Sequence, residues 1–165
     1  MLVKLHDYNK DEKIDRKYAY KAPNGFYYSS VQAYTETIER EAMRKKCIDY
    51  MHDLLNYQDF MKIPSIFYKK LKDWGLYGYK VVYSAMTLSE KSIRQAIINK
   101  NFDNEYNKVS YISAIIQNNL NDALKIETNK KKITSDLPKI ETDDIDNIGR
   151  QPKKAKSVAD LLGGV

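Results

Sequence analysis

The chain has 165 residues, 42% of them apolar and 30% charged, a composition typical of a soluble globular protein with one compact domain and an appendage. No apolar run approaches the roughly 20 residues that span a bilayer, and the first 13 residues lack the uninterrupted apolar stretch of a secretory signal. Cys47 is the single cysteine, which excludes an intramolecular disulfide. We therefore expect a cytoplasmic protein with no membrane partner.

The net charge of +6 comes from an unusual set of cations, 23 lysines against five arginines. Lysine suits phosphate as a point charge, whereas the arginine fork reads the edge of guanine. If the chain binds nucleic acid, we therefore expect contacts with the backbone and little reading of bases. A second explanation stays open, because lysine, isoleucine, asparagine and tyrosine all have AT-rich codons, so their abundance can record a low-GC genome rather than a function.

Two different segments are expected before the first helix. Residues 1–16 are charged and show no clear period, which indicates a polar leader. In residues 17–28, Asn24 and Gly25 follow Pro23 between two short β-prone runs, and this pattern predicts a β-hairpin because both residues tolerate a positive φ. An isolated hairpin is barely stable, so it must pack against another element.

Residues 29–125 show the helical periodicity of an all-α bundle with four to five helices. Ser29 and Ser30 can cap the first, long helix. Its apolar stripe is expected to comprise Val31, Tyr34, Ile38, Met43, Cys47, Met51 and Leu54. The position of Cys47 on this stripe favours a buried structural thiol over a reactive one.

The stretch DWGLYGYKVVYSAM, residues 73–86, is rich in aromatic side chains. The main functional question is whether these rings and the nearby lysines bind nucleic acid or fill a corner between helices. The next helix is expected to have Pro64 in its first turn and Ser65 as its cap. Its apolar stripe comprises Ile66, Phe67, Leu71 and Trp74, so a core role is favoured for the indole. Gly75 is expected to end this helix as a left-handed residue. One further helix is expected to begin at KVVYSAM and another at Ser89, which we interpret as an N-cap.

Tyr77 and Tyr79 flank Gly78 and are expected to be partly exposed beside a group of lysines. The candidate DNA-binding residues of this region are Lys69, Lys70, Lys72, Tyr77, Tyr79 and Lys80. Rings that stack on bases next to cations that hold phosphates are typical of surfaces that bind nucleic acid. The alternative is a solvated lysine face with half-buried tyrosines.

The sequence shows no catalytic or metal-binding pattern. His6 and His52 are the only histidines, and neither has the cysteine, carboxylate or serine partners at the spacing that a triad or a zinc site requires. Neither a phosphate-binding glycine loop nor a calcium loop is present. We expect a protein that is not an enzyme and that needs no cofactor.

Residues 61–124 resemble the helical domain of the DnaD/DnaB-like primosomal and phage replication proteins of low-GC Gram-positive bacteria. The resemblance rests on IPSIFYKKLKDWGL, YKVVYSAM, SIRQAI and NKVSYISAIIQNNL, in that order. Tyr111 and Ile115 match the tyrosine and isoleucine that end the family domain, whereas Asn119 stands where the family has a tryptophan. The resemblance implies a role linked to DNA replication and DNA contacts from Lys108, Tyr111 and Asn119.

Residues 126–165 have alternating charge blocks and few large apolar side chains, which predicts a disordered tail. Its end, SVADLLGGV, presents Val158, Leu161 and Leu162, either as a motif that folds onto a partner or as an ordinary chain end. Together these features predict a non-catalytic DNA-binding accessory protein of a phage, plasmid or integrated element. The alternative is a protein-binding adaptor or inhibitor that captures a host factor.

Overall fold

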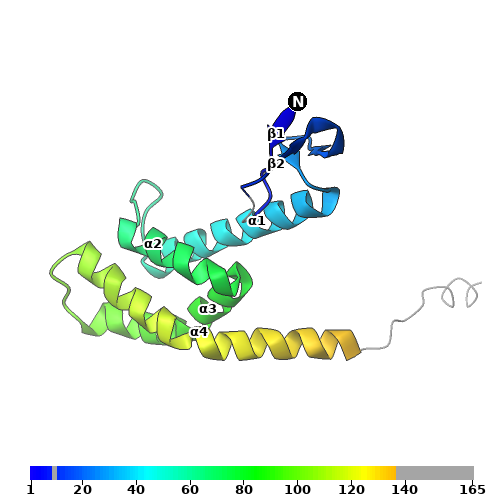
Figure 1. Ribbon diagram of the computed structural model, residues 1–165. Helices are drawn as coiled ribbons and strands as arrows, with labels where there is room; N and C mark the ends of the chain where they lie inside the picture. Colours follow the sequence, from blue (N-terminus) through cyan, green and yellow to red (C-terminus); the bar gives the residue numbers. More distant parts are fainter. Residues whose placement is uncertain (9–10, 137–165) are drawn as a thin grey trace, which may run out of the picture. The chain divides into compact units, whose positions relative to one another are not determined.

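The computed structural model describes residues 1–8 and 11–136 of the chain (Figure 1). The chain divides into two compact units, Met1–Lys131 and Lys132–Val165, and the contacts described below lie in the first. The expected fold class is confirmed: four α-helices make up most of the described residues, and a small β-hairpin precedes them.

The segment expected to be a polar leader, residues 1–16, contains two strands that the sequence did not indicate. β1 (Leu2–Lys4) pairs with β2 (Lys13–Asp15) in antiparallel orientation, with Val3 opposite Ile14. Each strand has only three residues, too few for a period to be recognised in a charged sequence. A 3-10 turn, η1 (Arg16–Tyr18), follows β2.

The expected hairpin is present as β3 (Tyr20–Lys21) and β4 (Tyr27–Tyr28), again antiparallel. Its turn differs in detail from the one expected. Gly25 has a φ of +84°, whereas Asn24 keeps a negative φ and accepts a hydrogen bond from the amide of Phe26. The glycine alone therefore supplies the left-handed residue that the reversal needs.

Backbone contacts join the two strand pairs to each other and to the first helix. Leu5 forms a parallel bridge to Tyr27, and the amide of His6 donates to the carbonyl of Tyr27 at 2.8 Å. Asp7 accepts a hydrogen bond from the amide of Ser29 at 2.9 Å. These bonds hold the strands at the start of α1, which satisfies the requirement that a hairpin pack against another element.

The first helix, α1 (Val31–Leu54), begins as expected, with the Ser30 hydroxyl accepting a hydrogen bond from the Ala33 amide at 3.0 Å. Only part of the predicted stripe is buried. Cys47 and the later stripe residues lie in the core, whereas Val31 and Ile38 are 58% and 46% exposed. The first half of α1 lies beside β4, and the remainder packs on the other helices.

The helices after α1 are α2 (Ser65–Trp74) and α3 (Tyr79–Asn99), joined by the 3-10 turn η2 (Gly75–Tyr77). Ser65 lies inside α2 and Pro64 occupies the cap position, so the expected serine cap is wrong. Ser89 is not a cap either. It lies within an unbroken α3, where its hydroxyl donates to the carbonyl of Ala85 at 2.7 Å instead of capping the start of a new helix.

The last helix, α4 (Glu105–Asp136), extends past residue 125, where we expected the bundle to end. Residues 126–136 are thus helical rather than part of a tail. The remaining residues, 137–165, lie outside the described part of the chain, and so do Val158, Leu161 and Leu162 of the proposed partner-binding motif.

The core lies where the second half of α1 meets α2, α3 and α4. Its largest fully buried side chains include Met51, Leu54, Phe67, Leu71, Met86, Ile93, Ile112 and Ile116. Trp74 is 3% exposed and packs edge-on against Phe67, with ring centroids 6.3 Å apart. The indole is therefore a core side chain, as its spacing predicted.

Candidate nucleic-acid interface

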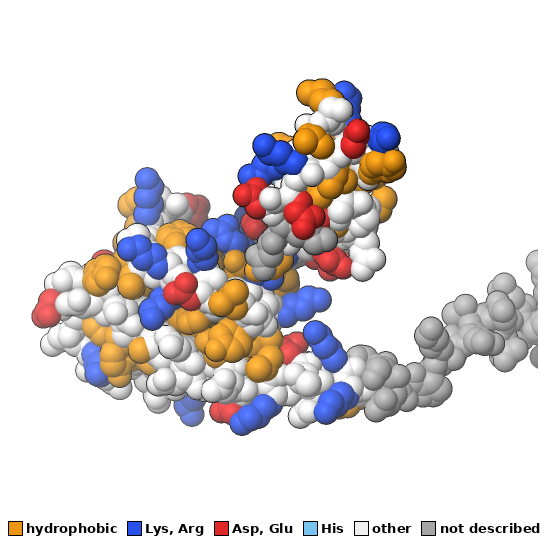
Figure 2. All heavy atoms as spheres, viewed as in Figure 1, with side chains coloured by type: hydrophobic (Ala, Val, Ile, Leu, Met, Phe, Trp, Pro, Cys, Tyr) orange, Lys and Arg blue, Asp and Glu red, His pale blue; other side chains and the backbone are white. Residues whose placement is uncertain are grey.

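The lysines of α2 lie on the side of the helix that faces away from the core. Phe67, Leu71 and Trp74 are buried at spacings of four and three residues. Because a helix turns by 100° per residue, Lys69 and Lys72 are directed to solvent, and both are exposed. Figure 2 shows Lys and Arg side chains over α2 with hydrophobic side chains among them.

Positive charge is concentrated around this helix. Residues 62–80 contain five lysines against a single acidic residue, Asp73. Residues 137–165 contain five cationic and five acidic side chains, so the net charge of +6 belongs to residues 1–136. The region around α2 therefore carries a local excess of positive charge, which attracts a polyanion.

The corner after α2 exposes two large side chains next to these lysines. Leu76 is 82% exposed and Tyr77 is 47% exposed, so the prediction of a partly exposed Tyr77 is confirmed. Gly78 turns the chain with a φ of +89° and a ψ of 135°, a conformation that is almost restricted to glycine. Lys80 follows immediately and is exposed.

Tyr79 is buried, with 8% of its surface exposed, so the prediction that it is partly exposed is wrong. Its ring lies against Gly75, where an added Cβ would come within 2.9 Å of the phenol oxygen. The guanidinium of Arg40 lies 4.7 Å from the ring centroid. Gly75 itself has a φ of −56°, so it is required for this close approach and not for the left-handed conformation that we expected.

Two hollows connect the candidate residues. Lys70, Tyr77 and Gln117 line one of them, with a volume of about 360 Å³, and the Lys70 ammonium donates to the Gln117 side chain at 3.4 Å. Tyr77 also lines a second hollow of about 230 Å³ together with Lys80 and with Lys131 of α4. The carboxylates of Glu36, Glu39 and Glu127 line the same hollow. Lys70 of α2 and Lys80 of α3 thus each line a hollow with Tyr77. Lys69 and Lys72 lie on the exposed side of α2. We call these five residues the α2 corner.

The three residues that the family resemblance implied do not extend this surface. The Lys108 ammonium donates to Glu105 at 2.7 Å and lies 5.4 Å from the ring of Tyr57, and its side chain is only 16% exposed. Asn119 donates to Ser89 of α3 at 2.9 Å and is half-buried. Both side chains are thus occupied by contacts within the bundle.

Tyr111 is 38% exposed, but it lies at a different place on α4. It contacts the loop before α4, with the Lys100 ammonium 4.0 Å from its ring and the Phe102 ring at 5.8 Å. Gln117, which meets α2, lies roughly 9 Å farther along α4 and about a third of a turn around it. Tyr111 and Lys100 therefore form a separate small cation–aromatic patch.

Arg40 is a residue whose role the sequence did not reveal. Its guanidinium donates to the carbonyl of Gly75 at 2.7 Å and to the hydroxyl of Tyr8, and it lies over the ring of Tyr8 at 3.3 Å. It thereby ties the N-terminal strands to the corner between α2 and α3. These partners lie 32 and 35 residues away in the sequence, so no local pattern could have indicated them.

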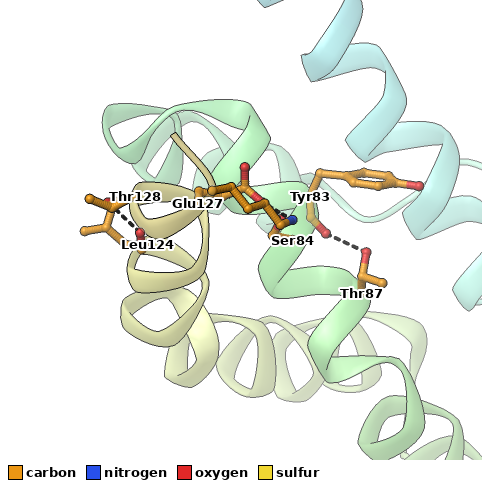
Figure 3. Close-up of polar contacts among 7 residues, drawn as sticks. Tyr83, Ser84, Thr87, Leu124, Glu127 and Thr128 are labelled. Carbon is orange, nitrogen blue, oxygen red and sulfur yellow. Dashed lines mark hydrogen bonds and ion pairs between the residues drawn. The ribbon is translucent and has the colours of Figure 1, made fainter. Parts of the chain in front are cut away.

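A further hollow of about 480 Å³ opens between α1, α3 and α4. We call it the α3 groove, and it is lined by Met43, Lys80, Tyr83, Ser84, Thr87, Leu88, Ile126, Glu127 and Lys130. Figure 3 shows Glu127 of α4 reaching across to Ser84 of α3, while the ring of Tyr83 extends toward α1. The sequence did not indicate this groove, because its lining comes from three helices.

The acidic side chain in this groove is held by its neighbours. Glu127 accepts hydrogen bonds from the Lys130 ammonium at 2.9 Å and from the Ser84 hydroxyl at 2.6 Å. These bonds outweigh the effect of burial and lower the pKa of Glu127 below its ordinary value. The carboxylate is therefore ionised at neutral pH and links α4 to α3.

The described residues offer little for nucleophilic or metal chemistry. Cys47 is fully buried, its thiol donates to the carbonyl of Tyr79 at 3.5 Å, and burial raises its pKa to about 12, so a structural role is confirmed. His52 bonds to the carbonyl of Met61 at 2.7 Å. In residues 1–8 and 11–136, no three His, Cys, Asp or Glu side chains are grouped closely enough to hold a metal ion.

Comparison with known proteins does not assign this site. Protein-family models, curated proteins and solved structures all gave no match to the chain. Among the described helices, none combines the length and the hydrophobicity needed to cross a bilayer.

Proposed function

We propose that this chain is a non-catalytic DNA-binding protein that holds the phosphate backbone with the α2 corner. The observation that supports this most directly is that Lys70 and Lys80 line two hollows that both include the exposed Tyr77, while Lys69 and Lys72 are exposed on α2. Ammonium groups around an aromatic face combine charge neutralisation with stacking on a base. The cations of the α2 corner are all lysines, and the neighbouring Arg40 is already bonded to Gly75 and Tyr8. Contacts with phosphate rather than base reading therefore dominate the proposal.

The biological setting of this proposal rests on the sequence. The resemblance of residues 61–124 to DnaD/DnaB-like proteins supports an accessory role in DNA replication, in the cytoplasm, for a phage, plasmid or integrated element. Lys108, Tyr79 and Asn119 drop out of the proposed contact set, because their side chains are buried or bonded within the bundle.

The test is a salt titration of DNA affinity for two matched double variants. Lys69→Glu with Lys72→Glu changes the α2 corner, and Lys13→Glu with Lys21→Glu makes the same charge change on exposed strand residues. Fluorescence anisotropy with a labelled duplex and a labelled single strand gives the affinity at several salt concentrations. We expect the α2 variant to reduce the slope of log affinity against log salt by about 2, and the strand variant to leave it unchanged.

Two results would contradict the proposal. Absence of binding to either DNA form at low salt would remove the function itself. An equal loss of affinity in the two variants would show that net charge alone, and no particular surface, attracts the DNA.

A second candidate function, capture of a host protein as an adaptor or inhibitor, is favoured by a different observation. The α3 groove exposes apolar side chains, which a protein partner can bury and which a charged phosphate backbone does not contact favourably.

A further inference from the structure

The α3 groove continues along most of the length of α3. A neighbouring hollow of about 470 Å³ shares Thr87 and Leu88 with it and is lined in addition by Glu90, Lys91, Arg94, Gln95 and Ile98. The shared residues make the two hollows one furrow on the side of α3 that the core does not use. α1 and α4 border the first part of this furrow through Met43 and Ile126.

The furrow exposes large apolar side chains along α3 and at its border with α4. Leu88 is 47% exposed and Ile98 is 80% exposed, and Ile126 of α4 adds an isoleucine that is 39% exposed. Tyr83 is half-buried and presents its ring between α3 and α1. Grouped apolar side chains of this kind, rimmed by polar ones, are typical of protein interaction surfaces.

The charges along the furrow favour an acidic occupant. Its two carboxylates already have partners, since Glu90 accepts from Tyr50 at 2.7 Å and from Arg94 at 2.8 Å, and Glu127 accepts from Ser84 and Lys130. Lys80 and Lys91 are exposed, and within the described residues no ion pair involves either of them. These two ammonium groups are therefore available to carboxylates of a partner.

We propose that this furrow binds an amphipathic, acidic helix of a protein partner. α3 provides the floor along the whole furrow, and α1 and α4 provide walls along its first part, a surface on which a further helix can pack. The partner helix would place apolar side chains at i, i+3, i+4 and i+7 on Tyr83, Leu88 and Ile98, with Glu or Asp beside Lys80 and Lys91. Of the α2 corner, Lys80 alone also lines this furrow, so the two proposed surfaces share that residue.

The test uses the full-length protein and three labelled synthetic peptides of about 18 residues, or five helical turns. The first has leucine at i, i+3, i+4 and i+7 with glutamate at the flanking positions. The second keeps the leucines and replaces glutamate by lysine, and the third keeps the glutamates and replaces leucine by serine. We expect the first peptide to bind, and each of the others to bind at least about tenfold more weakly in fluorescence anisotropy.

Matched variants then locate the binding site. Leu88→Asp is expected to weaken binding of the first peptide by about tenfold or more, whereas Leu76→Asp, an equal change at an exposed residue of η2, should have no effect. Ile98→Asp provides the same test at a residue that is 80% exposed, in case Leu88→Asp disturbs the fold as seen by circular dichroism. Lys91→Glu should weaken binding, and Lys69→Glu should not.

The inference is overturned if the first peptide does not bind, or if the lysine peptide binds equally well. It is also overturned if the control variants weaken binding as much as the groove variants. Loss of oligonucleotide binding in Leu88→Asp, with peptide binding unchanged, would instead assign the furrow to nucleic acid. Because the α2 variants report on DNA separately, a failure of this inference leaves the proposed DNA-binding function unaffected.

Discussion

Two buried serines show how differently the same hydroxyl can be used in this core. Ser89 of α3 donates to the carbonyl of Ala85 and accepts from Asn119 of α4, so it links two helices. Ser113 of α4 is 1% exposed, and its hydroxyl oxygen has no hydrogen-bond partner within the described residues. A buried hydroxyl without a partner costs stability, whereas one that is fully bonded contributes to it.

We therefore predict opposite outcomes for two identical substitutions. Ser89→Ala should lower the free energy of unfolding by about 1–2 kcal/mol, because Asn119 loses its partner on α3. Ser113→Ala should be neutral or stabilising, because it removes a polar atom that makes no bond. Urea unfolding followed by circular dichroism measures both, and an equal loss of stability in the two variants would contradict this assignment.

At the scale of elements, the last turns of α4 depend on few contacts. Leu124 and Ile126 are each 39% exposed, so these turns bury little apolar surface. The hydrogen bond from Ser84 to Glu127 ties this part of α4 to α3 (Figure 3). The α3 groove is bounded by Ile126 and Lys130, so its shape depends on this link.

We predict that Glu127→Gln lowers the free energy of unfolding at pH 7 by about 1 kcal/mol. The pKa of Glu127 is lowered in the fold, so its contribution is complete above the ordinary value and is lost as the pH falls through the lowered pKa. The difference between the wild type and Glu127→Gln should therefore shrink at acid pH. Chemical denaturation at pH 7 and at about pH 3 measures it.

The matched control for this prediction is Glu41→Gln. Glu41 lies 3.6 Å from Arg44 on the exposed surface of α1, with its side chain 61% exposed, and exposed pairs contribute little. A change below about 0.5 kcal/mol is expected at both pH values. If Glu41→Gln and Glu127→Gln behave alike, the link between α3 and α4 does not stabilise the fold.

At the scale of the whole molecule, charge is distributed unevenly along the chain. Residues 1–136 account for the net charge of +6, because the acidic and basic side chains of residues 137–165 balance. Long-range attraction of a polyanion depends on net charge, whereas counterion release depends on the cations that touch phosphate. The α2 corner supplies four such lysines.

We predict that a chain ending at Asp136 keeps the salt dependence of DNA binding. The slope of log affinity against log salt should match that of the full-length protein within about one unit, because the truncation leaves the net charge and the α2 corner unchanged. Anisotropy titrations of both chains on one labelled duplex provide the measurement. A slope reduced by 2 or more would show that Lys153, Lys154 or Lys156 contacts phosphate.

Much of the fold could be predicted from local signals. The stripe of Phe67, Leu71 and Trp74 predicted the core face of α2, and the Ser30 cap predicted the start of α1, because both depend on residues within one or two turns. Ser89 misled the sequence interpretation, because a serine before a helical pattern resembles a cap even when it lies inside a longer helix.

The candidate site was predictable only in part. The lysines of α2 could be assigned to a solvent face, since a buried stripe defines the opposite face of the same helix. The sequence could not predict that Tyr79 is buried and Tyr77 is exposed. Tyr79 is buried because its ring packs against Gly75 and Arg40, and Tyr77 is not covered in this way.

The sequence by itself therefore determined the class of fold, the lysine-rich character of the chain and the face of α2 that meets solvent, because composition and periodicity are local properties. Only the tertiary structure decided which aromatic rings are exposed, which polar side chains are already bonded, and where α1, α3 and α4 leave an apolar furrow. Each of these features depends on contacts between residues tens of positions apart, and no local pattern encodes such contacts.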